Sequence, residues 1–112
     1  MECTFCKIAK GELGELIYED DQVVAFNDIT PQAPTHILII PRRHISTIND
    51  TFQADEQLLG HVITTAIQLA RDNNMADAGY RLVLNCNRGG GQVVYHIHLH
   101  LLGGRQMNWP PG

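Results

Sequence analysis

The stretch Tyr95-His96-Ile97-His98-Leu99-His100-Leu101-Leu102 alternates histidines with aliphatic residues. Successive side chains of a β-strand point to opposite faces, so the three histidines would share one face and the aliphatic residues the other. The aliphatic face can pack beneath a helix while three imidazoles face a cleft. Half of the six histidines of the chain lie within these few residues. The pattern predicts a strand over about residues 94–102 with a functional face.

A glycine-rich loop, residues 85–92, directly precedes this strand and contains three consecutive glycines. Glycine allows positive φ and lets backbone N–H groups approach an anion without a Cβ in the way. The glycines alone are also compatible with a tight turn between strands. Because three histidines follow within a few residues, the pattern favours a phosphate site.

The remaining elements predict an antiparallel sheet and two helices. Strands are expected over residues 16–19, 23–26, 36–40 and 80–84, the third stopped by Pro41. A long helix over about residues 54–73 shows one apolar stripe, with His61 on its solvent-exposed polar side. A short helix over residues 4–10 would be capped by Thr4 and ended by Gly11.

These elements predict an α+β fold, a single-domain antiparallel five-stranded sheet with one long and one short helix on one face. The domain would span residues 1–112, including a C-terminal tail at about 103–112.

Composition excludes several classes of function. The chain has 112 residues, of which 44% are hydrophobic and 18% charged, as in an ordinary globular protein. A net charge of −4 argues against a nucleic-acid binder. The longest aliphatic run covers residues 37–40 and the first residues lack an apolar signal core, so we expect no membrane partner and a cytoplasmic location. Three cysteines, an odd number, fit free thiols or a metal site better than disulfides.

With these motifs the sequence resembles the histidine triad (HIT) superfamily, and within it the branch of small adenosine phosphoramidases called Hint. The resemblance covers nearly the whole chain, including residues 26–36 and 102–112. It implies a HIT-like fold and cleavage of purine nucleoside phosphoramidates or aminoacyl-adenylates to the nucleoside monophosphate, through a covalent nucleotidyl-histidine intermediate. It also implies a homodimer in which the tail with Trp109 reaches the neighbouring subunit; the alternative is that the tail packs on its own domain. No Walker loop or carboxylate cluster is present, so we expect no cofactor for catalysis.

The resemblance implies catalytic roles for four histidines. His98 matches the nucleophile, His100 matches a phosphate ligand near the leaving group, and His96 completes the triad. His36 matches a fourth histidine that supports the active site, although a capping or packing role is also open.

The resemblance also implies a nucleotide-binding set around His98 and His100. Asp28 matches the acid that holds the ribose hydroxyls. The base pocket would be lined by Phe5, Ile8, Phe26 and Ile29, and the phosphate would be cradled mainly by backbone amides of Asn85, Gly91, Gln92 and Val93. Many members of the branch carry serine in place of Val93. Valine lacks that hydroxyl, so we expect His100 or water to protonate the leaving group.

A second site is suggested by Cys3-x-x-Cys6, which has the spacing of a zinc-ligand pair. His44 and His96 could supply the other two ligands, and some members of the family carry such a set around a structural zinc. The alternative is that both cysteines are small buried hydrophobes on the first helix. We expect a structural zinc that ties the amino terminus to the sheet.

Three other functions remain open. A dinucleoside-polyphosphate hydrolase would use the same nucleophile, although the tail with Trp109 favours a phosphoramidase. A non-catalytic nucleotide-binding regulatory module would use the same pocket, so only turnover separates it from the enzyme. A metal carrier would use the histidine strand but leave the glycine loop and Asp28 without a role.

Overall fold

The computed structural model describes residues 3–112, so Met1 and Glu2 of the expected domain lie outside the described residues. One antiparallel sheet has the strand order β1-β2-β3-β5-β4. Its strands are β1 (Tyr18–Glu19), β2 (Val23–Asn27), β3 (Thr35–Pro41), β4 (Tyr80–Leu84) and β5 (Leu99–Gly103). Helix α1 (Thr4–Ala9) precedes the sheet and helix α2 (Glu56–Asp72) connects β3 to β4. This arrangement confirms the expected α+β five-stranded fold.

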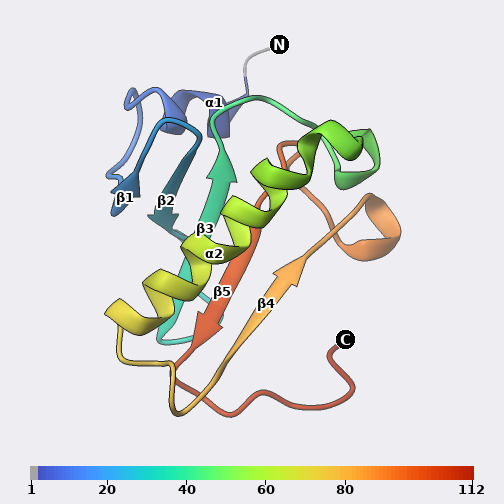
Figure 1. Ribbon diagram of the computed structural model, residues 1–112. Coiled ribbons are helices and arrows are strands. Elements are labelled where there is room, and N and C mark those ends of the chain that lie inside the picture. The colour runs from blue at the N-terminus through green and yellow to red at the C-terminus, as the bar shows by residue number, and fades with distance from the viewer. Residues whose placement is uncertain (1–2) are drawn as a thin grey trace.

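Alternation along the central strands directs one set of apolar side chains to the face of the sheet that α2 covers (Figure 1). Ile37 and Ile39 of β3 pair with Leu101 and Leu99 of β5, and all four are at most 3% exposed. They pack against the buried stripe of α2, formed by Val62, Ala66, Leu69 and Ala70. Burying each large aliphatic side chain contributes about 1.5–3 kcal/mol. The expectation that Leu99 and Leu101 lie beneath the long helix is confirmed.

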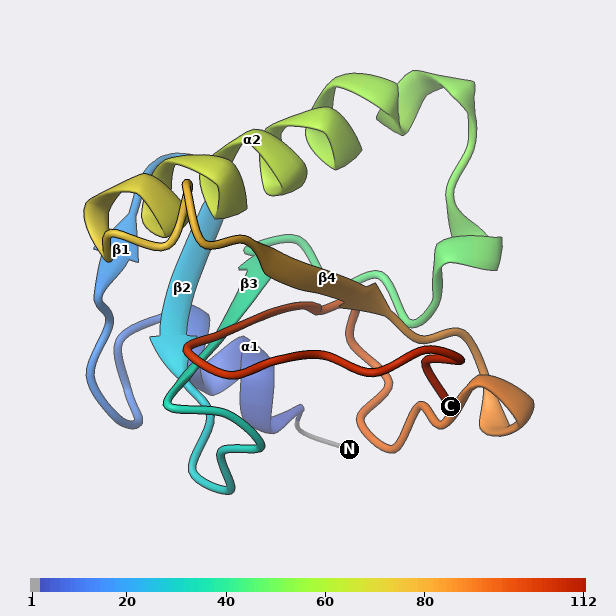
Figure 2. The ribbon, with the colours of Figure 1, turned by 90° about the horizontal axis from the view of Figure 1, so that it is seen from below.

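Helix α1 lies on the opposite face of the sheet (Figure 2), so the expectation of both helices on one face is wrong. Its Phe5 and Ala9 pack against the β2 and β3 side chains that alternate with those facing α2, namely Val24, Phe26, Leu38 and Ile40. A helix of six residues is too short to be stable alone. Packing on this second face therefore stabilises α1, and the layers run α2, sheet, α1.

The structure corrects the start of the histidine strand, because β5 begins at Leu99 rather than at residue 94. Residues just before it have partners outside the sheet. The Ile97 amide donates to the carbonyl of Ile45 (2.8 Å), and the Val94 carbonyl accepts a hydrogen bond from the Gln92 side chain (3.0 Å). The segment before β5 is therefore held by the loop that follows β3.

Helix α1 begins at Thr4 as predicted but with a different N-cap, and α2 begins at Glu56 rather than at about residue 54. Cys3, not Thr4, is the N-cap of α1, and its side chain makes no capping bond. Gly11, with φ of 77°, follows the end of α1 as expected. A 3-10 turn, η2 (Gln53–Asp55), precedes α2. Two further 3-10 turns are η1 (Ile48–Asp50) and η3 (Arg88–Gly90). No helix within residues 3–112 is long and apolar enough to cross a membrane.

His61 ties α2 to the β1–β2 hairpin; its side chain is 35% exposed, on the polar side of the helix as predicted, but it also has a partner. Its Nε2 lies 2.6 Å from Oδ2 of Asp20. The Tyr18 hydroxyl donates to the same oxygen (2.6 Å), and the amides of Gln22 and Val23 donate to Oδ1. Burial alone would raise the pKa of Asp20, but these hydrogen bonds outweigh it and hold that pKa well below its usual range.

Candidate active site

The face of the sheet that carries α1 also carries the histidines. On β3 and β5, Leu38 pairs with His100, and His36 lies two residues before Leu38 on the same face. His98 directly precedes β5. The ring centroids of His98 and His100 lie 4.9 Å apart, and those of His36 and His100 lie 5.2 Å apart. The structure thus brings together three of the four histidines expected to be catalytic.

Hydrogen bonds fix the tautomers of His36 and His100. The backbone amide of Gln32 donates to Nδ1 of His36 (3.0 Å), so the proton of a neutral His36 lies on Nε2. That nitrogen is 2.9 Å from Nδ1 of His100 and donates to it, which leaves the proton of His100 on its own Nε2. Nε2 of His100 is the one buried side-chain nitrogen or oxygen of residues 3–112 that has no partner. Such an unpaired donor is rare in a protein interior and marks a place for a ligand.

His98 presents the opposite kind of group. Its Nδ1 lies 2.8 Å from the backbone carbonyl of His96, which can only accept, so Nδ1 carries the proton. The lone pair is therefore on Nε2, which makes no hydrogen bond within the described chain. The ring is held edge-on against Phe5, with centroids 5.1 Å apart. A nucleophilic nitrogen of His98 thus stands beside an N–H donor of His100.

Burial keeps the imidazoles of His36 and His100 neutral. It lowers the pKa of His100 from 6.5 to about 4, and neighbouring His98 and His36 lower it further, against a weaker opposite effect of Asp28. Burial also lowers the pKa of His36, while Asp28, whose Oδ2 is 3.4 Å from His36 Nε2, acts in the opposite direction. His100 therefore remains a neutral donor at pH 7.

The ring of His96 turns toward the cysteines instead of lining the cleft with His98 and His100. It is completely buried, with Nδ1 3.5 Å from Cys3 Sγ and 3.6 Å from Cys6 Sγ. Nδ1 of His44 lies 3.3 Å from Cys6 Sγ. The four ligand atoms all lie within 4.8 Å of one another. The structure therefore gathers the complete expected metal-ligand set.

The aromatic residues expected to line the base pocket lie next to the histidines. Phe5 and Phe26 meet edge to face at 5.3 Å, and half-buried Ile8 packs against the same cluster. Ile29 is 98% exposed, so in this structure it does not pack in that cluster. Oδ1 of Asp28 accepts a hydrogen bond from the backbone of the same turn (2.8 Å), and the carboxylate stays partly exposed beside the histidines.

The glycine-rich loop offers fewer free amides than the sequence suggested. The amides of Gly91 and Gln92 donate to the carbonyls of Arg88 and Asn87 within the loop. The amide of Val93 has no partner in residues 3–112, and the residue is 85% exposed. Of these three, Val93 therefore presents the amide that is free to bind a phosphate oxygen.

The Gln92 side chain has a structural role that the sequence did not reveal. It is buried, and its Oε1 accepts the Asn87 amide (2.8 Å) while Nε2 donates to the Ser46 and Val94 carbonyls. It thus clamps the glycine-rich loop onto the segment that follows β3. Asn85 is half-buried at the start of this loop. All the partners of Gln92 are backbone groups, which leave no signature in a sequence.

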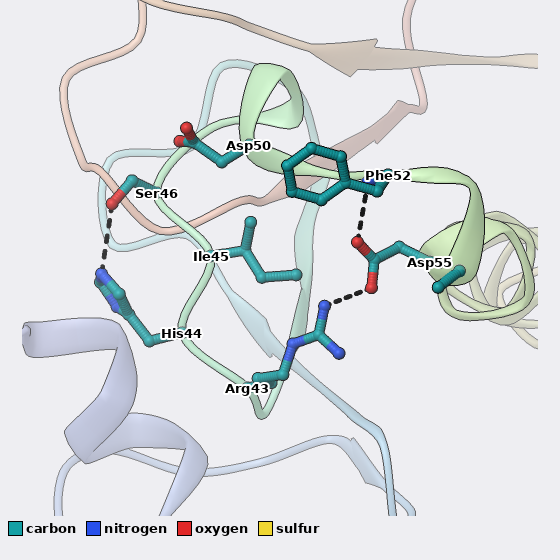
Figure 3. Close-up of a pocket in the computed structure, with 8 residues that line it drawn as sticks. Arg43, His44, Ile45, Ser46, Asp50, Phe52 and Asp55 are labelled. Carbon is teal, nitrogen blue, oxygen red and sulfur yellow. Dashed lines mark hydrogen bonds and ion pairs between the residues drawn. The ribbon is translucent and has the colours of Figure 1, made fainter.

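A separate open hollow of about 600 Å³ lies along residues 43–55 (Figure 3). Arg43 and Asp55 form an ion pair across it, and Asp55 also accepts the Phe52 amide (2.9 Å). These polar groups satisfy one another, whereas the histidine cluster contains an unpaired buried donor. The histidine cluster is therefore the candidate active site.

Comparison with known proteins agrees with this geometry. The family model of the HIT domain matches residues 12–107. A purine nucleoside phosphoramidase of Escherichia coli K12 is 54% identical over 107 residues, covering 95% of this chain and 90% of that protein. A HIT family hydrolase of Legionella pneumophila Philadelphia 1 is 58% identical with a TM-score of 0.97, covering 99% of this chain and all of that one. A histidine triad protein of Clostridium difficile is 38% identical with a TM-score of 0.93, covering 96% and 95% of the two chains.

The lowered pKa of His100 predicts a pH-dependent stability. Between pH 6.5 and about 4 the unfolded chain binds a proton at His100 that the folded chain does not, so stability is complete above pH 6.5 and falls as the pH drops through this window. Thermal unfolding across the window should show a larger loss for the native chain than for His100→Gln. The control His61→Gln retains His100 and should keep the full loss. Equal losses in the native chain and His100→Gln would contradict the burial argument.

Proposed function

The chain belongs to the HIT domain family and is a hydrolase of that family, and we propose that it cleaves purine nucleoside phosphoramidates to the nucleoside monophosphate through a nucleotidyl intermediate on His98. The observation that carries the proposal is the pairing of a lone pair on His98 Nε2 with a buried, unpartnered N–H on His100 Nε2. The phosphoramidase named above, which is 54% identical, supports the choice of substrate.

In the first step, Nε2 of His98 attacks the α-phosphorus while the P–N bond breaks and its electron pair leaves with the amine. Covalent catalysis divides a difficult displacement into two easier ones. Burial of the ring and the hydrogen bond from Nδ1 to the His96 carbonyl hold the nucleophile in one orientation. The amine takes up its proton from water, because Val93 has no hydroxyl to supply it and a neutral His100 that gave up its Nε2 proton would be left as an anion.

In the second step, water attacks the same phosphorus, the bond to His98 breaks, and the nucleoside monophosphate is released. Over both steps one water is consumed, with its hydroxyl on phosphorus and its proton on the amine. The His100 N–H and the free Val93 amide supply hydrogen bonds where negative charge develops on the phosphoryl oxygens, usually the largest catalytic contribution. Asp28 accepts from the ribose hydroxyls and Phe5 and Phe26 contact the base.

Replacement of His98 tests the covalent mechanism. His98→Ala should lower turnover of a fluorogenic adenosine 5′-phosphoramidate by roughly three orders of magnitude or more, because the nucleophile is lost. AMP binding, measured by calorimetry, should persist. The matched control is His61→Ala, since His61 is another histidine whose ring makes a hydrogen bond but lies on α2. Turnover by His98→Ala close to that of the native chain would contradict the covalent mechanism.

The same assay separates the other candidate functions. Binding of AMP without turnover by the native chain would identify a nucleotide-binding regulatory module. Faster turnover of a diadenosine polyphosphate than of the phosphoramidate would identify a dinucleoside-polyphosphate hydrolase.

We further propose that Cys3, Cys6, His44 and His96 hold a structural zinc. With Zn–S and Zn–N bonds of about 2.3 and 2.0 Å, sulfur and nitrogen in a tetrahedral site lie roughly 3.5 Å apart. The sulfur–nitrogen distances here are 3.3, 3.5 and 3.6 Å. Nε2 of His96 lies 2.7 Å from the Pro41 carbonyl and donates to it, which leaves the Nδ1 lone pair for the metal. Four protein ligands would close the site, so the zinc would cross-link the chain and take no part in the reaction. Three unpaired cysteines also suit a reducing cytoplasm.

Removal of one thiolate should empty this site. Purified native protein is expected to contain one equivalent of zinc by elemental analysis, and Cys6→Ser should lose most of it. Cys86→Ser is the matched control, because Cys86 lies in the glycine-rich loop outside the ligand set, and it should retain the zinc. Zinc-free native protein after expression in zinc-supplemented medium would refute the proposal.

Two features support the expected homodimer. β4 is an edge strand with one neighbour, so its outer backbone groups are available for pairing. The tail after β5 contains no helix or strand, and Arg81 of β4 donates to its Asn108 carbonyl (2.8 Å). Trp109 is 83% exposed, so it does not pack on its own domain.

Sedimentation velocity checks the association. The native chain should sediment as a dimer. The Trp109→Ala dimer should dissociate already at a higher protein concentration, because a large apolar contact is lost. Phe52→Ala removes another exposed aromatic ring, far from Trp109 in the sequence, and should leave the dimer unchanged. A native chain that stays monomeric at all concentrations would rule the homodimer out.

A further inference from the structure

His96 belongs to both sites described above. Its Nδ1 faces the two cysteine sulfurs, its Nε2 bonds to the Pro41 carbonyl, and its own carbonyl accepts the proton of His98 Nδ1. The residue is completely buried. A metal on Nδ1 would therefore restrain the residue whose carbonyl sets the tautomer and orientation of His98.

Phe5 provides a second connection, because it lies between Cys3 and Cys6 on α1. Its ring meets His98 edge-on at 5.1 Å and nearly perpendicular, at 89°, and lies 6.1 Å from the ring of His96. α1 is six residues long and lacks a side-chain cap, so it has little stability of its own. Ligation of both cysteines would fix the helix that presses Phe5 against His98.

His44 provides a third connection, through the two residues that follow it. The Ile45 carbonyl accepts the amide of Ile97, next to His98 (2.8 Å). The Ser46 carbonyl accepts from Nε2 of Gln92 (2.7 Å), whose side chain clamps the glycine-rich loop. The four ligands thus connect to the nucleophile, to the base pocket and to the phosphate loop.

We infer that metal binding at Cys3, Cys6, His44 and His96 positions His98, Phe5 and the glycine-rich loop, so that the metal and the nucleotide bind cooperatively. The inference rests on the proposed nucleotide site and zinc site, and adds a coupling between them. Coupling of binding free energies is reciprocal, so AMP must tighten zinc by the same factor by which zinc tightens AMP. Cys6 and His96 are then positioning residues as well as metal ligands.

The test measures both affinities of the native chain. Zinc affinity is obtained by competition with a chromogenic chelator, with and without saturating AMP, and AMP affinity by calorimetry of the zinc-loaded and metal-free chains. We expect both to change by one common factor of about fivefold or more. In the cobalt-loaded chain, AMP should also shift the visible ligand-field absorption, a measurement that does not need the metal-free chain to stay folded.

A variant pair locates the coupling. Phe5→Leu retains all four ligands but loses the ring contact with His98, so zinc should bind as tightly as before without AMP while the common factor shrinks. Phe52→Leu changes an exposed ring outside both sites and should keep the full factor. Unchanged zinc affinity and an unchanged cobalt spectrum with AMP bound would overturn the coupling and leave both sites standing. Failure of the zinc-loaded chain to bind AMP would instead overturn the proposed function, and failure to bind zinc would overturn the metal site.

Discussion

The pairing of β3 with β5 is the constraint on which the other features depend. Leu38 lies opposite His100, and Ile37 and Ile39 lie opposite Leu101 and Leu99. Because strand side chains alternate, a shift of one residue would turn the histidines into the core beneath α2 and expose the aliphatic side chains. The apolar face is almost completely buried, so this error would cost many buried aliphatic contacts. Packing of α2 thus fixes which face carries the histidines.

On that second face, backbone groups determine what each imidazole can do. A series of hydrogen bonds runs from the Gln32 amide through His36 to His100 and leaves an N–H on His100. The His96 carbonyl binds the Nδ1 proton of His98 and leaves a lone pair on its Nε2. Adjacent rings therefore expose groups of opposite character, an acceptor that can attack phosphorus and a donor that can bind its oxygens. Burial lowers the pKa of His100 and keeps it neutral, which preserves the tautomer on which this division depends. The low pKa of His100 results from burying its imidazole at a place where a ligand would accept the remaining N–H hydrogen bond.

Periodicity in the sequence predicted the features that depend on side-chain identity. The alternation around His98 and His100, the apolar stripe of α2 and the Cys3–Cys6 spacing all led to groups that the structure brings together. Features that depend on backbone groups were missed, since a carbonyl or amide has the same chemistry at every residue. The late start of β5 accompanies the hydrogen bond from the Ile97 amide to the Ile45 carbonyl, and the tautomers depend on backbone groups of Gln32 and His96 in the same way. The placement of α1 on the face opposite α2 depends on the contact between Phe5 and Phe26. These residues lie in distant segments of the chain, so no local sequence pattern encodes the contact.

His96 lies on the α1 side of the sheet with His98 and His100, as predicted, but its ring contacts the cysteines. Residues before Leu99 lie outside the strand, but the side chain of His96 still faces α1 and there reaches Cys3 and Cys6. Its Nε2 proton is used by the Pro41 carbonyl, so a neutral His96 directs a lone pair at two sulfurs that also carry lone pairs. Thiol protons can fill that gap, but a cation that displaces them satisfies all four ligands at once. The His96 carbonyl accepts the proton of His98 Nδ1, so the residue that favours a cation at its side chain orients the nucleophile through its backbone.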